Sequence, residues 1–172
     1  MPRNIEIKAR VAAMPELRQR AAALADDGPV EIAQDDTFFH CDNGRLKLRA
    51  LSAGSGQLIF YRRADDAGPK ESFYVVTTTS DPDGLREALT LAYGQSGRVV
   101  KQRTLYIVGR TRVHLDRVEG LGDFMELEVV LAEDDSADDG FAEATDVMAS
   151  LGIEESQLVQ GAYLDLLSRS KA

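Results

Sequence analysis

Charged and apolar residues alternate along much of this chain, and that period of two is the feature that most restricts its fold. A period of two places successive side chains on opposite faces of a β-strand. Seven segments show the pattern, and an eighth strand is expected near residues 36–41. The seven segments are residues 4–11, 45–51, 57–63, 70–76, 99–108, 110–116 and 124–131.

The charged face of these segments has a strong bias in sign. An antiparallel sheet with one face in water explains alternation, but the chain has a net charge of −9, so a solvated face should be acidic. The predicted face instead carries eleven basic residues and only four carboxylates. The basic residues are Lys8, Arg10, Arg45, Lys47, Arg49, Arg63, Lys70, Lys101, Arg103, Arg110 and Arg112; the carboxylates are Glu6, Asp116, Glu126 and Glu128.

Two arrangements tolerate so many like charges on one face. An open sheet could bind a polyanion such as RNA, or the strands could close into a barrel with a wet, charged interior. An acidic protein is a poor candidate for nucleic-acid binding, and the opposite, apolar face needs a cover of helices. Helices are expected at residues 15–25, 81–93, 141–151 and 156–168, and loops at residues 52–56, 65–68 and 133–140.

The expected fold is therefore α+β: an antiparallel, eight-stranded closed β-barrel with a charged interior and helices packed outside. One domain is expected over residues 1–172, because no linker divides the chain. The single cysteine, Cys41, excludes an internal disulfide and indicates a reducing compartment. No apolar run has the length of a signal peptide or a membrane span, so we expect a cytoplasmic protein with no membrane partner.

The two kinds of charge on this face point to two kinds of ligand. Arginine and lysine are the usual partners of phosphate. The carboxylates would repel phosphate, so their expected role is to hold a hard divalent cation, Mg²⁺ or Mn²⁺, that bridges to phosphate oxygens. The residues alone therefore predict a di- or triphosphate ligand together with a metal ion.

Four motifs in order resemble the CYTH superfamily, the triphosphate tunnel metalloenzymes. Residues 5–8, Ile-Glu-Ile-Lys, look like the Glu-x-Glu-x-Lys signature of that family, with Asn4 at the position of the first glutamate. Residues 113–128 resemble the Asp-x-Val-x-Gly-Leu-Gly-x-Phe-x-Glu-x-Glu block of the class IV adenylate cyclase branch. Residues 44–49 and 100–103 fit the basic strands between them, and residues 161–167 resemble the closing helix.

The resemblance implies a metal-dependent enzyme that holds a triphosphate in a tunnel. It favours an adenylate cyclase, which converts ATP to 3′,5′-cyclic AMP and pyrophosphate. Two alternatives stay open: a triphosphatase acting on thiamine triphosphate or inorganic tripolyphosphate, and a triphosphate-binding protein with weak or no turnover. A homodimer is a further expectation from the cyclase branch, and no nucleic-acid partner is expected.

These expectations assign roles to individual residues. Catalytic roles are expected for Lys8, Lys101, Arg103 and Asp116, and metal ligation for Glu6, Glu126 and Glu128. His114 is either a general base or a structural residue, and Tyr61 and Tyr74 either stack on adenine or pack in the core. The expected substrate-binding residues are Lys8, Arg10, Arg45, Lys47, Arg49, Arg63, Lys70, Lys101, Arg103 and Arg112.

Overall fold

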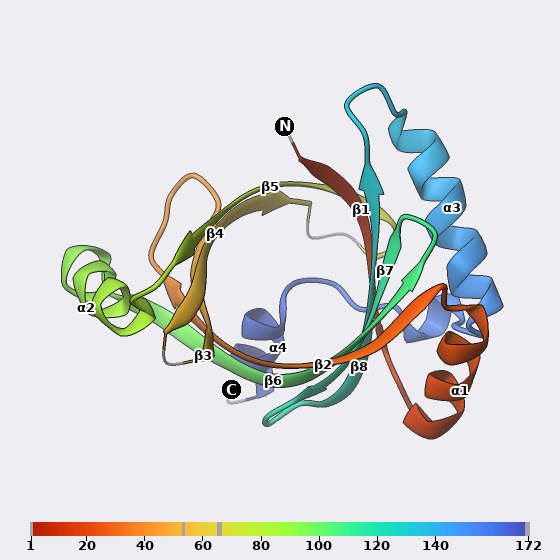
Figure 1. The fold of residues 1–172 in the computed structure, drawn as a ribbon, viewed down its shortest axis with the longest axis horizontal. Coiled ribbons are helices and arrows are strands. Elements are labelled where there is room, and N and C mark those ends of the chain that lie inside the picture. Colours follow the sequence, from red (N-terminus) through yellow and green to blue (C-terminus); the bar gives the residue numbers. More distant parts are fainter. Residues whose placement is uncertain (1, 53, 65–66, 171–172) are drawn as a thin grey trace.

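Eight antiparallel strands form a closed barrel in the computed structural model, which describes residues 2–52, 54–64 and 67–170 (Figure 1). The order around the ring is β1-β5-β4-β3-β2-β6-β7-β8, and β1 closes it by pairing with both β5 and β8. The expected fold class is confirmed. The strands are β1 (Arg3–Arg10), β2 (Asp27–Phe39), β3 (Arg45–Ser52), β4 (Ser55–Arg63), β5 (Lys70–Thr79), β6 (Gln95–Val108), β7 (Thr111–Val118) and β8 (Gly122–Leu131).

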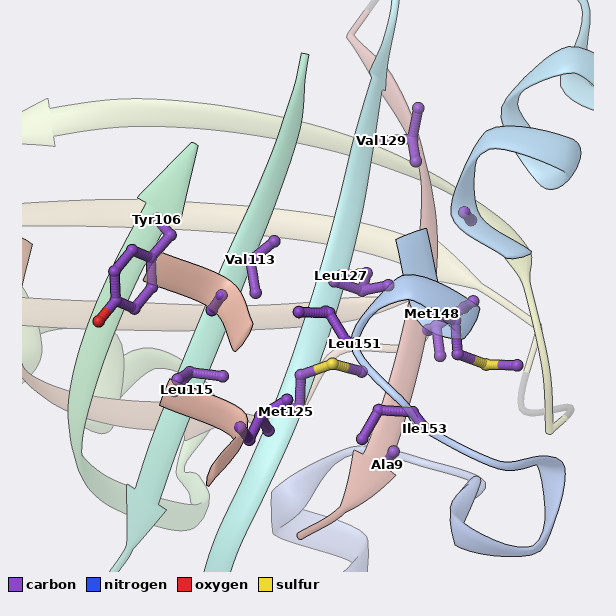
Figure 2. Close-up of a cluster of buried hydrophobic side chains, with 14 of the residues drawn as sticks. Ala9, Tyr106, Val113, Leu115, Met125, Leu127, Val129, Met148, Leu151 and Ile153 are labelled. Carbon is purple, nitrogen blue, oxygen red and sulfur yellow. The ribbon is translucent and has the colours of Figure 1, made fainter. Parts of the chain in front are cut away.

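The main hydrophobic core lies outside the barrel, on the apolar parity of β1, β7 and β8. Helices α1 (Met14–Leu24) and α3 (Ala137–Ser150) lie along this side of the ring (Figure 1). Ile7, Val113 and Leu127 are fully buried there. Figure 2 shows Val113 and Leu127 on this face, together with Met148 of α3 and Leu151 at its end. Burial of this face fixes which parity points inward, because a slip of one residue would send the charges into the core.

The opposite side of the barrel has much less cover than the sequence predicts. Helix α2 (Pro82–Tyr93) begins at Asp81, whose side chain accepts from the amide of Gly84, and it ends at Gly94, as expected. This helix buries only Pro82 among its described residues, and Leu91 stays 82% exposed. Val75 on β5 is also exposed, so the expectation that helices cover the whole apolar face is wrong here.

Several predicted bounds need correction. Strand β2 begins at Asp27 instead of near residue 36, and β6 begins at Gln95 directly after α2. Helix α3 begins at Ala137, within the predicted loop 133–140, because the Ser136 side chain caps it by accepting from the amide of Asp139. Of the predicted loop 52–56, residue 53 lies outside the described residues, whereas Ser52 ends β3, Ser55 begins β4, and the two residues pair. Of the predicted loop 65–68, residues 65 and 66 lie outside the described residues.

Only the second half of the helix predicted over residues 156–168 forms, as α4 (Tyr163–Ser170). The first half is a short 3₁₀ helix, η1 (Glu155–Gln157), followed by Leu158 in an extended conformation and a bend at Gly161. Leu158 bridges to Ala9, and the amide of Val159 donates to the carbonyl of Lys8 at 3.0 Å. Pairing with β1 therefore overrides the helical spacing of the apolar residues. None of the helices formed by the described residues is both long and apolar enough to span a membrane.

Candidate active site inside the barrel

A cavity of about 480 Å³ occupies the barrel interior, and every strand contributes to its wall. The residues that line it have the parity predicted from the sequence, since they alternate with the buried residues of the outer core. Charged side chains share the wall with apolar ones such as Ile59, Val99 and Leu105. The cavity wall is therefore less uniformly charged than the alternation of the sequence predicted.

One wall of the cavity is a basic cluster built around a buried aspartate. Arg49 donates to both Asp36 oxygens at 2.8 Å, and the Lys47 ammonium lies 3.2 Å from the same carboxylate. Lys101 lies 4.0 Å away. Burial by itself would raise the pKa of Asp36, but Lys47, Arg49 and Lys101 lower it well below its usual range. One carboxylate thus offsets part of the charge of three cations, and the cluster keeps a net positive charge.

A second basic element joins β6 to β7. Arg103 donates from Nε and Nη2 to the two Asp116 oxygens, at 2.7 and 2.6 Å. The Tyr163 hydroxyl donates to Asp116 Oδ2 at 2.7 Å, and all three side chains are buried. Arg103 is thereby held in a fixed orientation, with Glu126 at 3.5 Å from its Nη2 atom. Asp116 lies behind Arg103 and does not line the cavity.

The three predicted metal ligands lie on the adjacent strands β1 and β8. Glu6 stands directly opposite Glu128 in the register of these strands, and all three carboxylates, including Glu126, line the cavity. Burial raises the pKa of Glu6, Arg63 opposes this, and Glu128 and Glu126 raise it further. The structure therefore brings the three carboxylates to one wall, across from the basic cluster.

Each of these carboxylates also has a cationic neighbour. Glu6 bonds to Arg63 at 2.6 Å, and Glu128 bonds to Arg112 at 2.6 Å. Lys8 lies 3.4 Å from Glu126. Burial lowers the pKa of Lys8 to about 8, although Glu126 acts in the opposite direction. A metal ion bound to these carboxylates would compete with Lys8, Arg63 and Arg112, which already balance part of the negative charge of the carboxylates.

His114 also lies on this wall, opposite Glu126 in the β7–β8 register. Its imidazole, Glu126 and Glu128 each offer a possible ligand atom, and these atoms lie within 4.8 Å of one another. Burial and the nearby Arg103 charge lower the pKa of His114 to about 4, so the ring is neutral near pH 7. Two carboxylates and a neutral imidazole are a donor set that fits a divalent cation.

The extended segment before α4 reaches the cavity. The Lys8 ammonium donates to the carbonyl of Gly161 at 3.2 Å and lies 4.1 Å from the centre of the Tyr163 ring. Lys101 lies 4.9 Å from that ring, and Ala162 lines the cavity beside it. In Figure 1 this C-terminal segment lies within the outline of the ring. It contacts two of the predicted phosphate-binding lysines.

Three of the predicted substrate-binding residues do not line the cavity: Arg10, Arg45 and Lys70. Arg10 is exposed and lies 5.0 Å from the Phe124 ring. Arg45 bonds to Asp165 of α4 at 2.6 Å. Lys70 is buried but does not line the cavity. Seven of the ten predicted substrate-binding residues line the cavity: Lys8, Lys47, Arg49, Arg63, Lys101, Arg103 and Arg112.

Arg110 is a correction to the predicted basic face. It follows Gly109 in the β6–β7 turn, where φ is +58°, so it falls outside the strand alternation. Its guanidinium contacts Asp135 at 2.5 Å and Glu143 of α3 at 2.8 Å, on the outer side of the barrel. Asp36 is the main residue that the sequence interpretation missed, although its segment was assigned to a strand.

A closed antiparallel barrel with a basic wall and a carboxylate wall around one internal cavity defines a charged-tunnel protein. The CYTH domain model matches residues 2–163, and the chain belongs to the CYTH family. The family resemblance seen in the sequence is thereby confirmed.

Known proteins support the same family and fold. The chain is 26% identical over 176 residues to adenylate cyclase CyaB of Aeromonas hydrophila, covering 97% of this chain and 90% of that protein. The PH1012 protein of Pyrococcus horikoshii OT3 is similar in structure, with a TM-score of 0.84, 25% identity and coverage of 95% and 99% of the two chains. HpAC1 of Hippeastrum, a proposed adenylyl cyclase with a dominant triphosphatase activity, has a TM-score of 0.66, 17% identity and coverage of 98% and 97%.

Proposed function

We propose that this protein is a divalent-metal-dependent enzyme that binds a nucleoside triphosphate inside the barrel, and that it acts as an adenylate cyclase. The observation that carries the proposal is the placement of opposite charges on two walls of one cavity. Lys47, Arg49 and Lys101 form the basic wall, whereas Glu126 and Glu128 stand on the other. A triphosphate with a bridging cation has the matching distribution of charge.

In the proposed reaction the ribose 3′-hydroxyl gives up its proton to water as its oxygen attacks the α-phosphorus, and the bond from that phosphorus to the bridging oxygen breaks to release pyrophosphate. The chain's contribution is positioning and charge stabilisation. Arg103 is suited to a phosphoryl oxygen because Asp116 and Tyr163 fix its orientation. A bound divalent cation would supply further stabilisation of the charge on the departing pyrophosphate, and Glu6, Glu126 and Glu128 are proposed to hold it. The similarity to the Aeromonas adenylate cyclase supports this reaction.

A triphosphatase is the second candidate: a water attacks the terminal phosphorus, the bond from that phosphorus to the bridging oxygen breaks, and orthophosphate and the diphosphate are released. One observation favours it, the surroundings of Tyr61, a ring on the wall that was expected to stack on adenine. Lys47 and Arg63 lie 5.3 and 5.5 Å from the centre of the Tyr61 ring. A ring with two cationic neighbours is less available for stacking on adenine. The reported activity of HpAC1 is consistent with this alternative.

Product identification separates these functions. The purified protein is incubated with ATP, thiamine triphosphate or tripolyphosphate, in Mg²⁺ or Mn²⁺, and the products are separated by chromatography. Cyclic AMP with pyrophosphate supports the cyclase, and orthophosphate supports the triphosphatase. Tight binding without turnover supports the remaining alternative, a binding protein.

A matched pair of variants tests the location of the site. Arg103→Ala removes a buried arginine from the cavity wall, whereas Arg98→Ala removes an exposed arginine that pairs with Asp35. We expect Arg103→Ala to lose most tripolyphosphate affinity and Arg98→Ala to keep it. Equal affinity in both variants and the parent would exclude the tunnel as the site.

A further inference from the structure

His114 presents a buried polar atom that the protein itself leaves without a partner. Its Nδ1 atom has no hydrogen-bond partner among the described residues, and the side chain is 7% exposed. Buried polar atoms of this kind usually have a ligand, a water or an ion as the missing partner.

The surroundings of His114 point to a cation as that partner. Glu128 Oε1 lies 3.8 Å from Nδ1, too far for a hydrogen bond, while Oε2 of the same carboxylate bonds to Arg112. One carboxylate oxygen is thus turned toward Arg112 and the other toward the imidazole. The gap between Oε1 and Nδ1 suits two ligand atoms that share one metal ion.

Glu126 completes the group. Its oxygens lie 3.4 Å from the Lys8 ammonium and 3.5 Å from Arg103 Nη2. Both distances exceed those of a normal hydrogen bond to a charged nitrogen. Glu126 is therefore held loosely by its cationic neighbours, and its carboxylate can turn toward a metal ion at lower cost than Glu6, which bonds to Arg63 at 2.6 Å.

We propose that His114, Glu126 and Glu128 form a mixed nitrogen–oxygen site for one divalent cation, and that the imidazole makes this site prefer Mn²⁺ to Mg²⁺. The inference rests on the proposed function and revises its metal site: His114 takes the place that was assigned there to Glu6, and the choice between Mg²⁺ and Mn²⁺ is decided for Mn²⁺. Mg²⁺ requires oxygen ligands in a strict octahedron and gives up water reluctantly. Imidazole nitrogen is a common ligand of transition metals, so exchanging an oxygen ligand for nitrogen favours Mn²⁺.

The test is nitrogen coupling to bound Mn²⁺, measured by pulsed electron paramagnetic resonance on the tag-free full chain without substrate. The chain contains two histidines, which makes the assignment tractable. We expect ¹⁴N coupling from a directly bound imidazole, which changes to the ¹⁵N pattern when histidine alone is isotopically labelled. This measurement on the unaltered protein does not depend on whether a variant folds.

Two matched variants locate the ligand. His114→Ala should abolish the nitrogen coupling and weaken Mn²⁺ binding about ten-fold or more, the scale of losses at metal sites. Competition by Mg²⁺ should then become more effective relative to the parent. His40→Ala is the control, because His40 is exposed and does not line the cavity; it should keep both the coupling and the affinity.

Three results would overturn the inference: no bound Mn²⁺, bound Mn²⁺ without histidine coupling, or coupling that persists in His114→Ala. Tripolyphosphate binding and product formation are measured on the same preparations. If these remain while the coupling is absent, the mixed site is wrong and the proposed function stands. If tripolyphosphate does not bind and is not turned over, the proposed function fails independently of the metal result.

Discussion

Arg103 and Asp116 face each other across β6 and β7 and share two hydrogen bonds, at 2.7 and 2.6 Å. The aspartate is fully buried and also accepts from Tyr163. Because Asp116 does not line the cavity, we propose that it positions Arg103 and balances its charge, in place of the catalytic role expected from the sequence. A substrate would contact the arginine while the aspartate behind it keeps the guanidinium in one orientation.

The first prediction follows from that pair. Asp116→Asn should lower the free energy of unfolding by about 3 kcal/mol, because a buried guanidinium loses its counter-ion, and should weaken tripolyphosphate binding. Asp35→Asn is the control, since Asp35 forms the exposed ion pair with Arg98 on the outside of the barrel and should cost less than about 1 kcal/mol. Urea denaturation and calorimetry measure the two effects. Equal losses in the two variants would contradict the positioning role.

The second prediction concerns the aspartate within the basic cluster. Asp36→Asn removes the carboxylate that offsets Lys47, Arg49 and Lys101, so the melting temperature should fall through repulsion among these cations. Added tripolyphosphate should raise the melting temperature of the variant more than that of the parent, because the anion replaces the missing charge. An identical shift in both proteins would show that the ligand binds away from this cluster.

The third prediction concerns pH. Burial lowers the pKa of Lys47, and Arg49 lowers it further, so the ammonium loses its proton at lower pH than a free lysine does. Tripolyphosphate affinity should therefore fall as the pH rises toward about 10.5, the ordinary lysine value. The same depressed pKa acts oppositely on folding: the unfolded chain holds this proton more tightly, so the contribution of Lys47 to stability rises with pH over that window.

Lys47→Arg provides the control for this pH dependence, because arginine keeps its charge throughout the range. Calorimetric titrations of tripolyphosphate between about pH 7 and pH 10 should show a shallower decline in the variant than in the parent. A decline of the same steepness would assign the pH dependence to another group.

The fourth prediction tests how α3 is held against the barrel. A Cβ atom at Gly140 would lie 2.6 Å from Ile5 Cγ1 and 2.8 Å from Leu131 Cδ2. Gly140→Ala should therefore destabilise the fold by about 1–3 kcal/mol through overpacking, despite the higher helix propensity of alanine. Gly54→Ala, where an added Cβ meets no atom within 4 Å, should be close to neutral in the same urea titration. A neutral Gly140→Ala would mean that α3 can move outward without cost.

Much of the barrel could be predicted because the side-chain period and the β-pleat are the same. Once Ile7 and Leu127 are assigned to the core, Lys8 and Glu126 must point the other way. Asp36 escaped this argument because Asp35, its neighbour on the outer face, is also polar and pairs with Arg98. With polar residues on both parities, the segment gives no alternation to interpret.

The remaining errors come from local geometry and long-range pairing. Arg110 appeared to continue the alternation of its strand, but the turn at Gly109 places it outside the barrel. The contacts of Tyr163 could not be predicted, because they depend on the pairing of Leu158 and Val159 with β1, which brings the following segment to the barrel. The spacing of apolar residues within this segment does not reveal that it pairs with β1, which is about 150 positions earlier in the chain.

The position of β1 between β5 and β8 has a consequence for how this molecule is made. A ribosome produces β1 before its partners β5 and β8, so both hydrogen-bonding edges of β1 stay unpaired until those strands have been synthesised. Such an edge invites pairing with other chains. Glu6 and Lys8, the charges that later serve the cavity, also make this strand a poor template for aggregation while it waits. We therefore expect the charges that line the finished cavity to protect the nascent chain before any interior exists.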